Sequence, residues 1–270
     1  MKFQQKLNGI VAKNNSLLCV GLDPDLDKLP KHLLEKEDPI FEFNKEIIDA
    51  TFDLVCSYKP NIAFYEAYGI EGLKSLKKTL EYLQEKCPEI PIILDAKRGD
   101  IGNTAARYAK AVFEYWNVDA VTVFPHLGKD ALEPFLKYDD KLVILLIKTS
   151  NPDAGIFQNL QVGDEPYYLK VAKTVKEWNF SNVGLFVGAT YPKELADVRA
   201  LFPDSVFLTA GVGAQGAKTE EAVKAGVDKN GGNFICNNSR EIIYASTEKD
   251  FTEAARTKAL AIRDEINKYR

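Results

Sequence analysis

The sequence predicts an α/β protein, a single (β/α)8 TIM barrel with an N-terminal helix and a lid loop around residues 150–165. Three observations indicate this fold. Eight short apolar runs recur along the chain, amphipathic segments at helical spacing separate them, and polar residues gather where many of the runs end. With 270 residues, of which 46% are hydrophobic, the chain can bury a large core and has the usual length of one barrel. We therefore expect one domain over residues 1–270.

The eight apolar runs are interpreted as buried parallel strands. In chain order they lie at 16–22, 54–59, 90–95, 120–124, 142–148, 183–187, 206–210 and 234–237. Each is short and apolar on both faces, which is typical of a strand covered by helices on one side and by the barrel interior on the other. Before the first run, Phe3, Leu7 and Ile10 mark one face of a helix, and an alanine- and isoleucine-rich face at 254–266 predicts the last helix.

An open, doubly wound sheet is the structural alternative, because it also alternates strands and helices. The count of eight strands and the polar residues at their ends favour the closed barrel. The longest irregular stretch runs from 150 to 165 and contains Asn151, Pro152, Gly155 and Gly163. A loop of that length is uncommon in a compact barrel unless it serves as a lid or a binding loop.

Composition favours a small ligand over a polymer. The chain has 35 Lys and Arg against 39 Asp and Glu, a net charge of -4, so no broad basic field is present to bind a nucleic acid. Its four cysteines lie far apart, without metal-ligand spacing, and are expected to be reduced thiols in a cytoplasmic protein. The first residues mix charged and apolar side chains, so neither a signal peptide nor a membrane span is expected. Two distant histidines give little support for a zinc site.

Charged residues of alternating sign follow the first three predicted strands. Asp23 follows the first strand, Lys59 ends the second, and Asp95 and Lys97 end the third. In a barrel these strands are neighbours, and side chains two apart on an extended segment point the same way. Desolvating a lone charge costs several kcal/mol, so such charges must be paired or used. A lysine between carboxylates would stay protonated and could deliver a proton to a substrate.

A structural interpretation of the same residues remains open. Asp95, Lys97 and Asp100 could merely cap a helix that starts near Asn103 and solvate a loop. Their place at the barrel end where active sites are built, and the equivalent places of Asp23 and Lys59, favour a functional site.

The segment 95–104, DAKRGDIGNT, resembles the signature of orotidine 5'-phosphate decarboxylases. Further segments match in the right order and are similar to the longer-chain branch of that family: CVGLDPD at 19–25, KPNIAFYEAYG at 59–69, TSNPDAGIFQ at 149–158, VGAT at 187–190 and GVGAQG at 211–216. Together they span nearly the whole chain.

The resemblance implies an enzyme that decarboxylates orotidine 5'-phosphate to UMP and CO2, the last step of de novo pyrimidine nucleotide synthesis, with no cofactor or metal. It also implies a homodimer with shared active sites. Lys97 would protonate C6 of the pyrimidine and Asp95 would face the scissile carboxyl group. Asp100 and Thr104 would reach in from the neighbouring subunit.

The remaining site residues implied by the resemblance bind the substrate. Asp23 and Lys59 would hold ribose hydroxyls, with Asn61 close by. Thr149, Ser150 and Gln158 would line the base and phosphate ends of the lid loop.

A phosphate site is predicted after the last two strands. Gly211, Gly213 and Gly216 precede a helical stretch from about Thr219, where bare backbone N–H groups can approach an anion, and Arg240 follows the eighth strand. The resemblance gives this role to Gln215 and Arg240. A tight turn with no ligand is the alternative for the glycines alone.

The chain departs from the family pattern at a few positions. Ala210 stands where proline is expected, residues 237–240 are an unusual form of the last phosphate segment, and His126 replaces a common tyrosine. We expect His126 to be a loop or interface residue, and the aromatic cluster of Phe64, Tyr65 and Tyr68 to serve packing.

Two other functions share some of these features. A metal-dependent phosphosugar synthase or epimerase would use the phosphate site and the D-x-K-x-x-D pattern but would need a divalent cation. A non-catalytic nucleotide-binding barrel would gain little from Lys97 among carboxylates.

Overall fold

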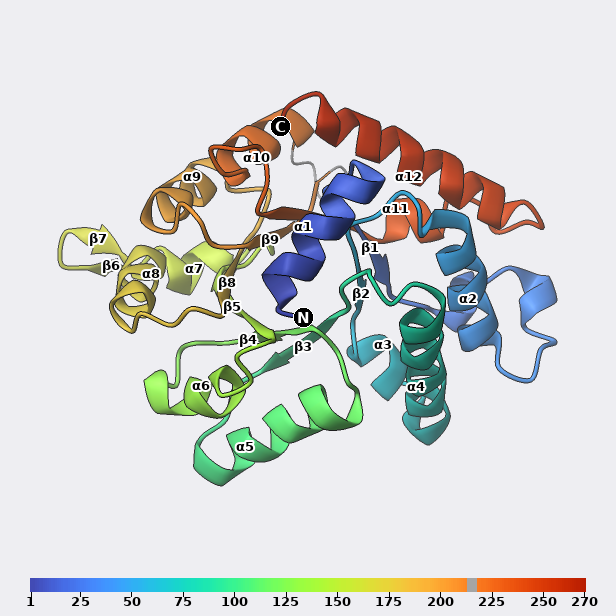
Figure 1. Cartoon of the computed structure of the whole chain (residues 1–270), viewed down its shortest axis with the longest axis horizontal. Coiled ribbons are helices and arrows are strands. Elements are labelled where there is room, and N and C mark those ends of the chain that lie inside the picture. Colours follow the sequence, from blue (N-terminus) through green and yellow to red (C-terminus); the bar gives the residue numbers. More distant parts are fainter. Residues whose placement is uncertain (213–217) are drawn as a thin grey trace.

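The computed structural model describes residues 1–212 and 218–270. Eight parallel strands form one sheet in the order β2-β1-β10-β9-β8-β5-β4-β3, and helices surround them as an outer ring (Figure 1). Parallel bridges Tyr58–Ile92 and Asn61–Asp95 join the two outermost strands of that order. The bridges close the sheet, so the predicted (β/α)8 barrel is confirmed and the open-sheet alternative is wrong.

All eight predicted strands are present, with small shifts at their ends. They are β1 Leu18–Leu22, β2 Ser57–Pro60, β3 Ile93–Arg98, β4 Ala120–Val123, β5 Leu142–Lys148, β8 Val183–Val187, β9 Phe207–Ala210 and β10 Phe234–Asn238. The second strand starts three residues later than expected, because the Leu54 N–H bonds to the Thr51 carbonyl in the turn that ends the preceding helix. The strand interiors are buried on both faces, as their unbroken apolar runs predicted.

The helices follow the strands as the amphipathic pattern indicated. Their bounds are α1 Phe3–Asn14, α2 Pro39–Thr51, α3 Ala63–Glu66, α4 Gly69–Lys86, α5 Gly102–Lys110, α6 Lys129–Leu136, α7 Ala154–Gln158, α8 Tyr167–Glu177, α9 Pro192–Leu201, α10 Thr219–Gly226, α11 Arg240–Ile243 and α12 Phe251–Asn267. Short 3-10 turns lie at Leu26–Lys28 and Lys31–Leu33, and a π-helical turn, Ala111–Tyr115, continues α5. Local sequence sets where α2 begins. The Asp38 carboxylate caps the helix by accepting the Phe41 N–H, and Pro39 occupies its first turn.

The N-terminal helix α1 crosses the barrel at the end where the strands begin (Figure 1). The Phe3 N–H donates to the carbonyl of Asp140, just before β5, and Lys6 pairs with Asp119, just before β4. Phe3, Leu7 and Ile10 are buried, as their spacing predicted. The carboxyl ends of the strands are therefore the end left available for a site.

Residues 150–165, predicted as an irregular lid loop, have more structure than expected. They contain helix α7 and most of an antiparallel ribbon made by β6 Gln161–Val162 and β7 Glu165–Pro166. The Tyr167 N–H donates to the Leu160 carbonyl and ties the ribbon to the start of α8. The prediction missed this because a five-residue helix and two-residue strands show no hydrophobic period.

The four cysteines are buried free thiols. None of the helices in the described ranges has both the length and the apolar character needed to cross a bilayer.

Candidate active site

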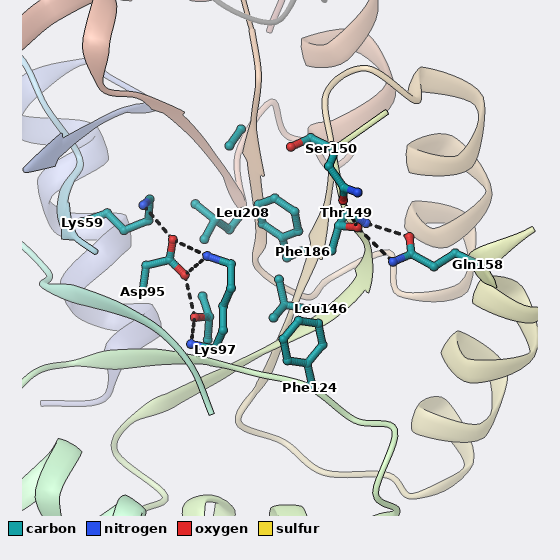
Figure 2. A pocket seen from close by; sticks show the side chains of 13 residues that line it. Lys59, Asp95, Lys97, Phe124, Leu146, Thr149, Ser150, Gln158, Phe186 and Leu208 are labelled. Atoms are coloured by element: carbon teal, nitrogen blue, oxygen red, sulfur yellow. Dashed lines mark hydrogen bonds and ion pairs between the residues drawn. The ribbon is translucent and has the colours of Figure 1, made fainter. Parts of the chain in front are cut away.

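A pocket of about 440 Å³ opens at the carboxyl ends of the strands. Figure 2 shows Lys59, Asp95 and Lys97 on one wall, Thr149, Ser150 and Gln158 on the opposite wall, and apolar side chains between them. The lining residues are Lys59, Asp95, Lys97, Thr122, Phe124, Leu146, Thr149, Ser150, Asn151, Gln158, Phe186, Leu208 and Ala210. A ligand with a polar edge on each side of a flat apolar face would fit this arrangement.

The Asp95 carboxylate lies between two lysine ammonium groups. Lys97 Nζ is 2.7 Å from Asp95 Oδ1 and 2.8 Å from Oδ2, and Lys59 Nζ is 3.1 Å from Oδ2 (Figure 2). Asp95 is 8% exposed and Lys59 only 5%, whereas the Lys97 side chain is 44% exposed. Of the two ammonium groups, that of Lys97 is therefore the one offered to a ligand.

The charges in this cluster hold one another ionised. Burial by itself would raise the pKa of Asp95, but the charges of Lys59 and Lys97, with hydrogen bonds from Lys97 and Thr122, bring that pKa well below its usual range. Burial would likewise lower the pKa of Lys59, and the charges of Asp95 and Asp23 raise it above its ordinary value. Asp95 and Lys59 are thus both charged across the physiological pH range.

Lys97 reaches Asp95 through an unusual backbone conformation. The pairing of β3 with β4 shifts register between Leu94 and Arg98, and Lys97 has a φ of 45°, in the left-handed region. The prediction that both side chains face inward is correct, but its reason, plain strand alternation, is incomplete. Strained conformations of this kind persist only where surrounding contacts hold them.

Thr122 on β4 supplies such contacts. Its hydroxyl accepts the Lys97 backbone N–H at 3.0 Å and donates to Asp95 Oδ1 at 2.8 Å. One buried hydroxyl therefore positions both the carboxylate and the backbone of the lysine beside it. Thr122 was not predicted, because its place within a buried strand does not say which face of that strand points into the barrel.

Asp23 and Asn61 border the pocket without lining it. Asp23 Oδ1 accepts the Asn61 backbone N–H at 3.2 Å, and the Asn61 side chain accepts the Ala63 N–H at the start of α3. The charge of Asp23 contributes to the raised pKa of Lys59, so the acidic and basic groups form one electrostatic cluster.

Asp100 and Thr104 lie away from the pocket of their own chain. Asp100 accepts the N–H of Ile101 at 2.8 Å, just before α5, and Thr104 is exposed on the first turns of that helix. Within one chain, the alternating row of charges thus ends at Lys97 rather than at Asp100.

The opposite wall is built by a hydrogen-bonded pair. The Thr149 N–H donates to Gln158 Oε1 at 3.0 Å, and Gln158 Nε2 donates to Thr149 Oγ1 at 2.9 Å (Figure 2). Thr149 Oγ1 in turn donates to Asn151 Oδ1 at 2.7 Å. The end of β5 and helix α7 are therefore joined side chain to backbone at the pocket.

The predicted phosphate site is described only in part. Gly211 has a φ of 101°, which favours glycine at the turn after β9, and Arg240 is exposed as the first residue of α11. Gly213, Gln215 and Gly216 lie outside the described residues.

His126 and Tyr65 have the loop and packing positions that were expected of them, whereas the apolar lining of the pocket was not expected. His126 lies in a loop outside the pocket, where its Nδ1 is hydrogen-bonded to the Tyr167 hydroxyl at 3.1 Å, and Tyr65 is fully buried. The apolar lining, Phe124, Leu146, Phe186 and Leu208, was not predicted. Inward-facing positions near the ends of the predicted strands could have indicated it, had the registers been known.

Comparisons with protein families, curated proteins and solved structures point to one family along nearly the whole chain. Residues 16–256 match the model of the orotidine 5'-phosphate decarboxylase / HUMPS family. A protein of Flavobacterium johnsoniae named orotidine 5'-phosphate decarboxylase is 52% identical over 97% of this chain and 96% of its own, and one of Dechloromonas aromatica with the same name is 50% identical over all of both chains. The solved structure of Leishmania donovani OMP decarboxylase superposes with a TM-score of 0.82 and 38% identity over 98% of this chain and all of its own. Leishmania donovani UMP synthase gives a TM-score of 0.89 and 39% identity, and this chain covers 56% of it.

Proposed function

This chain belongs to the orotidine 5'-phosphate decarboxylase / HUMPS family, and from that premise we propose that it converts orotidine 5'-phosphate to UMP and CO2. It is an enzyme, a carbon–carbon lyase of the class to which relatives at about 50% identity are assigned by name. The proposed reaction is the last step of de novo pyrimidine nucleotide synthesis, which we place in the cytoplasm.

The observation that carries the proposal is the Asp95 carboxylate held between Lys59 and Lys97 on the pocket wall. Loss of CO2 from C6 leaves an electron pair on a carbon with no ring position that delocalises it well. A preorganised ammonium beside that carbon stabilises the developing charge and then supplies the proton. Lys97 suits this role because its side chain is half-exposed to the pocket, whereas Lys59 is buried behind Asp95.

Asp95 has two effects in this scheme. It holds the Lys97 ammonium in place through two hydrogen bonds, and its own charge would lie beside the carboxylate of the substrate. Repulsion between the two carboxylates would be relieved as CO2 leaves. The ammonium provides both the electrostatic stabilisation and the proton, so the scheme proceeds without a metal or an organic cofactor.

The other pocket residues would bind the nucleotide. Asp23, Lys59 and Asn61 lie on the side proposed for the ribose, and Thr149, Ser150 and Gln158 present polar atoms on the opposite wall. Gly211 and Arg240, with Gly213 and Gln215, would bind the phosphate. Binding energy from that remote group can order the reacting end and so raise the rate as well as the affinity.

We propose a homodimer in which each pocket is completed by the other subunit. Asp100 and Thr104 lie outside the pocket of their own chain, and both are at least partly exposed. In the dimer, Asp100 of one subunit would extend the charged row next to Lys97 of the other. A lysine between two carboxylates is held protonated, as a proton donor requires.

The direct test is decarboxylation of orotidine 5'-phosphate, followed by the absorbance change of the pyrimidine, in EDTA and without added cofactor. We expect turnover under these conditions.

The Lys97→Ala variant should still bind the nucleotide while its turnover falls by many orders of magnitude, because it loses both charge stabilisation and the proton. Near-normal turnover in that variant would overturn the assigned role. Turnover of sugar phosphates only, and only with a divalent cation, would instead favour the phosphosugar synthase or epimerase class.

Mixing inactive variants tests the shared site. Lys97→Ala and Asp100→Ala chains, each inactive alone, should recover some activity after subunit exchange, because one hybrid pocket would hold both original residues. Absence of recovery, with exchange demonstrated by differently tagged chains, would contradict the shared site.

A further inference from the structure

A third lysine, Lys148, lies at the pocket end of β5 but outside the pocket. It is 0% exposed, and its Nζ lies 4.6 Å from the centre of the Tyr191 ring and 5.6 Å from that of Tyr168. Lys148 Nζ donates a hydrogen bond to Oδ1 of the neutral Asn159 side chain at 2.6 Å. Burial lowers the pKa of Lys148, an effect that the charge of Glu194 opposes. The two tyrosine rings stabilise the desolvated ammonium, but this contact does not by itself give a reason for a buried lysine at position 148.

A register shift takes this lysine out of the pocket. The pairing of β5 with β8 is regular up to Leu146–Phe186 and then slips, so that Lys148 pairs with Val187. Leu146 lines the pocket. On a regular strand the Lys148 side chain would point into the pocket as that of Leu146 does, since residues two apart share a face. The slip sends its ammonium instead between α8, which carries Tyr168, and the loop before α9, which carries Tyr191.

Two neighbouring hydrogen-bonded pairs then join β5 to the end of α7. Thr149 bonds with Gln158 at the pocket, and Lys148 bonds with Asn159 among the two tyrosines. The members are adjacent in sequence on both sides, 148–149 and 158–159. We call these two pairs the β5–α7 clasp. A backbone shift that carries Gln158 away from the pocket wall would also move Asn159 and strain its bond to Lys148.

Two further hydrogen bonds hold the segment around Lys148 to the neighbouring loop before α9. The Gly188 N–H donates to the Lys148 carbonyl at 2.8 Å, and the Tyr191 hydroxyl donates to the Asn151 carbonyl at 3.3 Å. Helix α7 itself has only five residues and carries the exposed Ile156 and Phe157, so it has few core contacts of its own. A helix this short depends on tertiary contacts for its position.

We propose that Lys148 is a positioning residue for the nucleotide site: through Asn159 it holds Gln158 against the pocket. The proposal rests on the proposed function for its kinetic consequence, but its structural part concerns the ligand-free protein. Since the pair lies away from the reacting carbon, its loss should weaken nucleotide binding more than it slows the chemical step.

The test compares Lys148→Met, which keeps the length and removes the charge, with Asn159→Leu, which removes the acceptor. Each should raise KM for orotidine 5'-phosphate about tenfold and leave kcat within about threefold. The double variant should be no worse than either single variant, because both act through one bond. Tyr168→Phe, which keeps the aromatic face, is the matched control and should keep the KM of the unaltered protein.

Amide hydrogen exchange without ligand separates this inference from the proposed function. Residues 154–160 should exchange faster in both single variants than in the unaltered protein. If the unaltered protein does not decarboxylate the nucleotide, the proposed function fails, and faster exchange at 154–160 would still support the clasp. Unchanged exchange overturns the clasp, as do an unchanged KM in Asn159→Leu or additive KM effects in the double variant. Asn159 is exposed, so Asn159→Leu carries the test even if Lys148→Met does not fold.

Discussion

Replacing Thr122 by valine tests whether one hydroxyl organises the reactive charges. Valine has nearly the shape of threonine, so the change leaves little cavity and removes two hydrogen bonds, to the Asp95 carboxylate and from the Lys97 N–H. A hydrogen bond to a charged group contributes about 1.5–3 kcal/mol, and a buried N–H without an acceptor costs about 1–3 kcal/mol. The N–H belongs to Lys97, whose side chain is half-exposed, so the low end applies to it, and we expect a total loss of about 3 kcal/mol.

The same change should impair turnover, because the left-handed backbone of Lys97 loses its only acceptor among the described side chains. We expect kcat to fall by about ten- to a hundredfold, the range that small misplacements of a catalytic group produce. Urea unfolding with an unchanged m-value measures the stability loss, which corresponds to a drop in Tm of about 6–12 °C. Thr122→Ser keeps the hydroxyl and is the control. Stability within about 0.5 kcal/mol of the unaltered protein, or a serine variant as impaired as the valine variant, would refute the reasoning.

Two further predictions concern buried charges. Asp95→Asn should lower the free energy of unfolding by about 3–5 kcal/mol at neutral pH, because Lys59 and Lys97 lose their shared carboxylate. The pKa of Asp95 is depressed in the folded state, so its contribution to stability is complete above the ordinary aspartate pKa of about 4 and is lost as pH falls toward the folded value. Urea titrations should therefore show a smaller difference in unfolding free energy between the unaltered protein and Asp95→Asn at pH 3 than at pH 7. An equal difference at both pH values would contradict this. Arg199→Lys should destabilise by about 3 kcal/mol, because the buried guanidinium donates to five backbone carbonyls that one ammonium cannot serve together; unchanged urea unfolding would show that the carbonyls find other donors.

The order and type of the elements could be predicted because they follow from local patterns. The unbroken apolar runs marked all eight strands, and the three- and four-residue steps marked the helices around them. The ribbon β6–β7 and helix α7 could not be predicted, because elements this short are formed by tertiary contacts such as that of Tyr167 with Leu160.

The candidate site divides in the same way. Asp95, Lys97 and Lys59 could be named from their places at strand ends, and they do line one pocket wall. Thr122 and the apolar lining could not, because which face of a strand points inward depends on register. Lys148 shows this most clearly: alternation alone would have put it beside Leu146 in the pocket, and a one-residue slip against β8 put it among tyrosines instead.

By itself, the sequence determined where the strands and helices lie and which charged residues stand at the strand ends, because hydrophobic period and residue type are local properties. Only the tertiary structure decided which of those charges meet. The closing bridge between β2 and β3 brings Lys59 to Asp95, the left-handed turn at Lys97 brings its ammonium to the same carboxylate, and the slip in β5 turns Lys148 away. Each of these depends on pairing between distant segments, where the energy of a contact is set by both partners and no single segment carries the information.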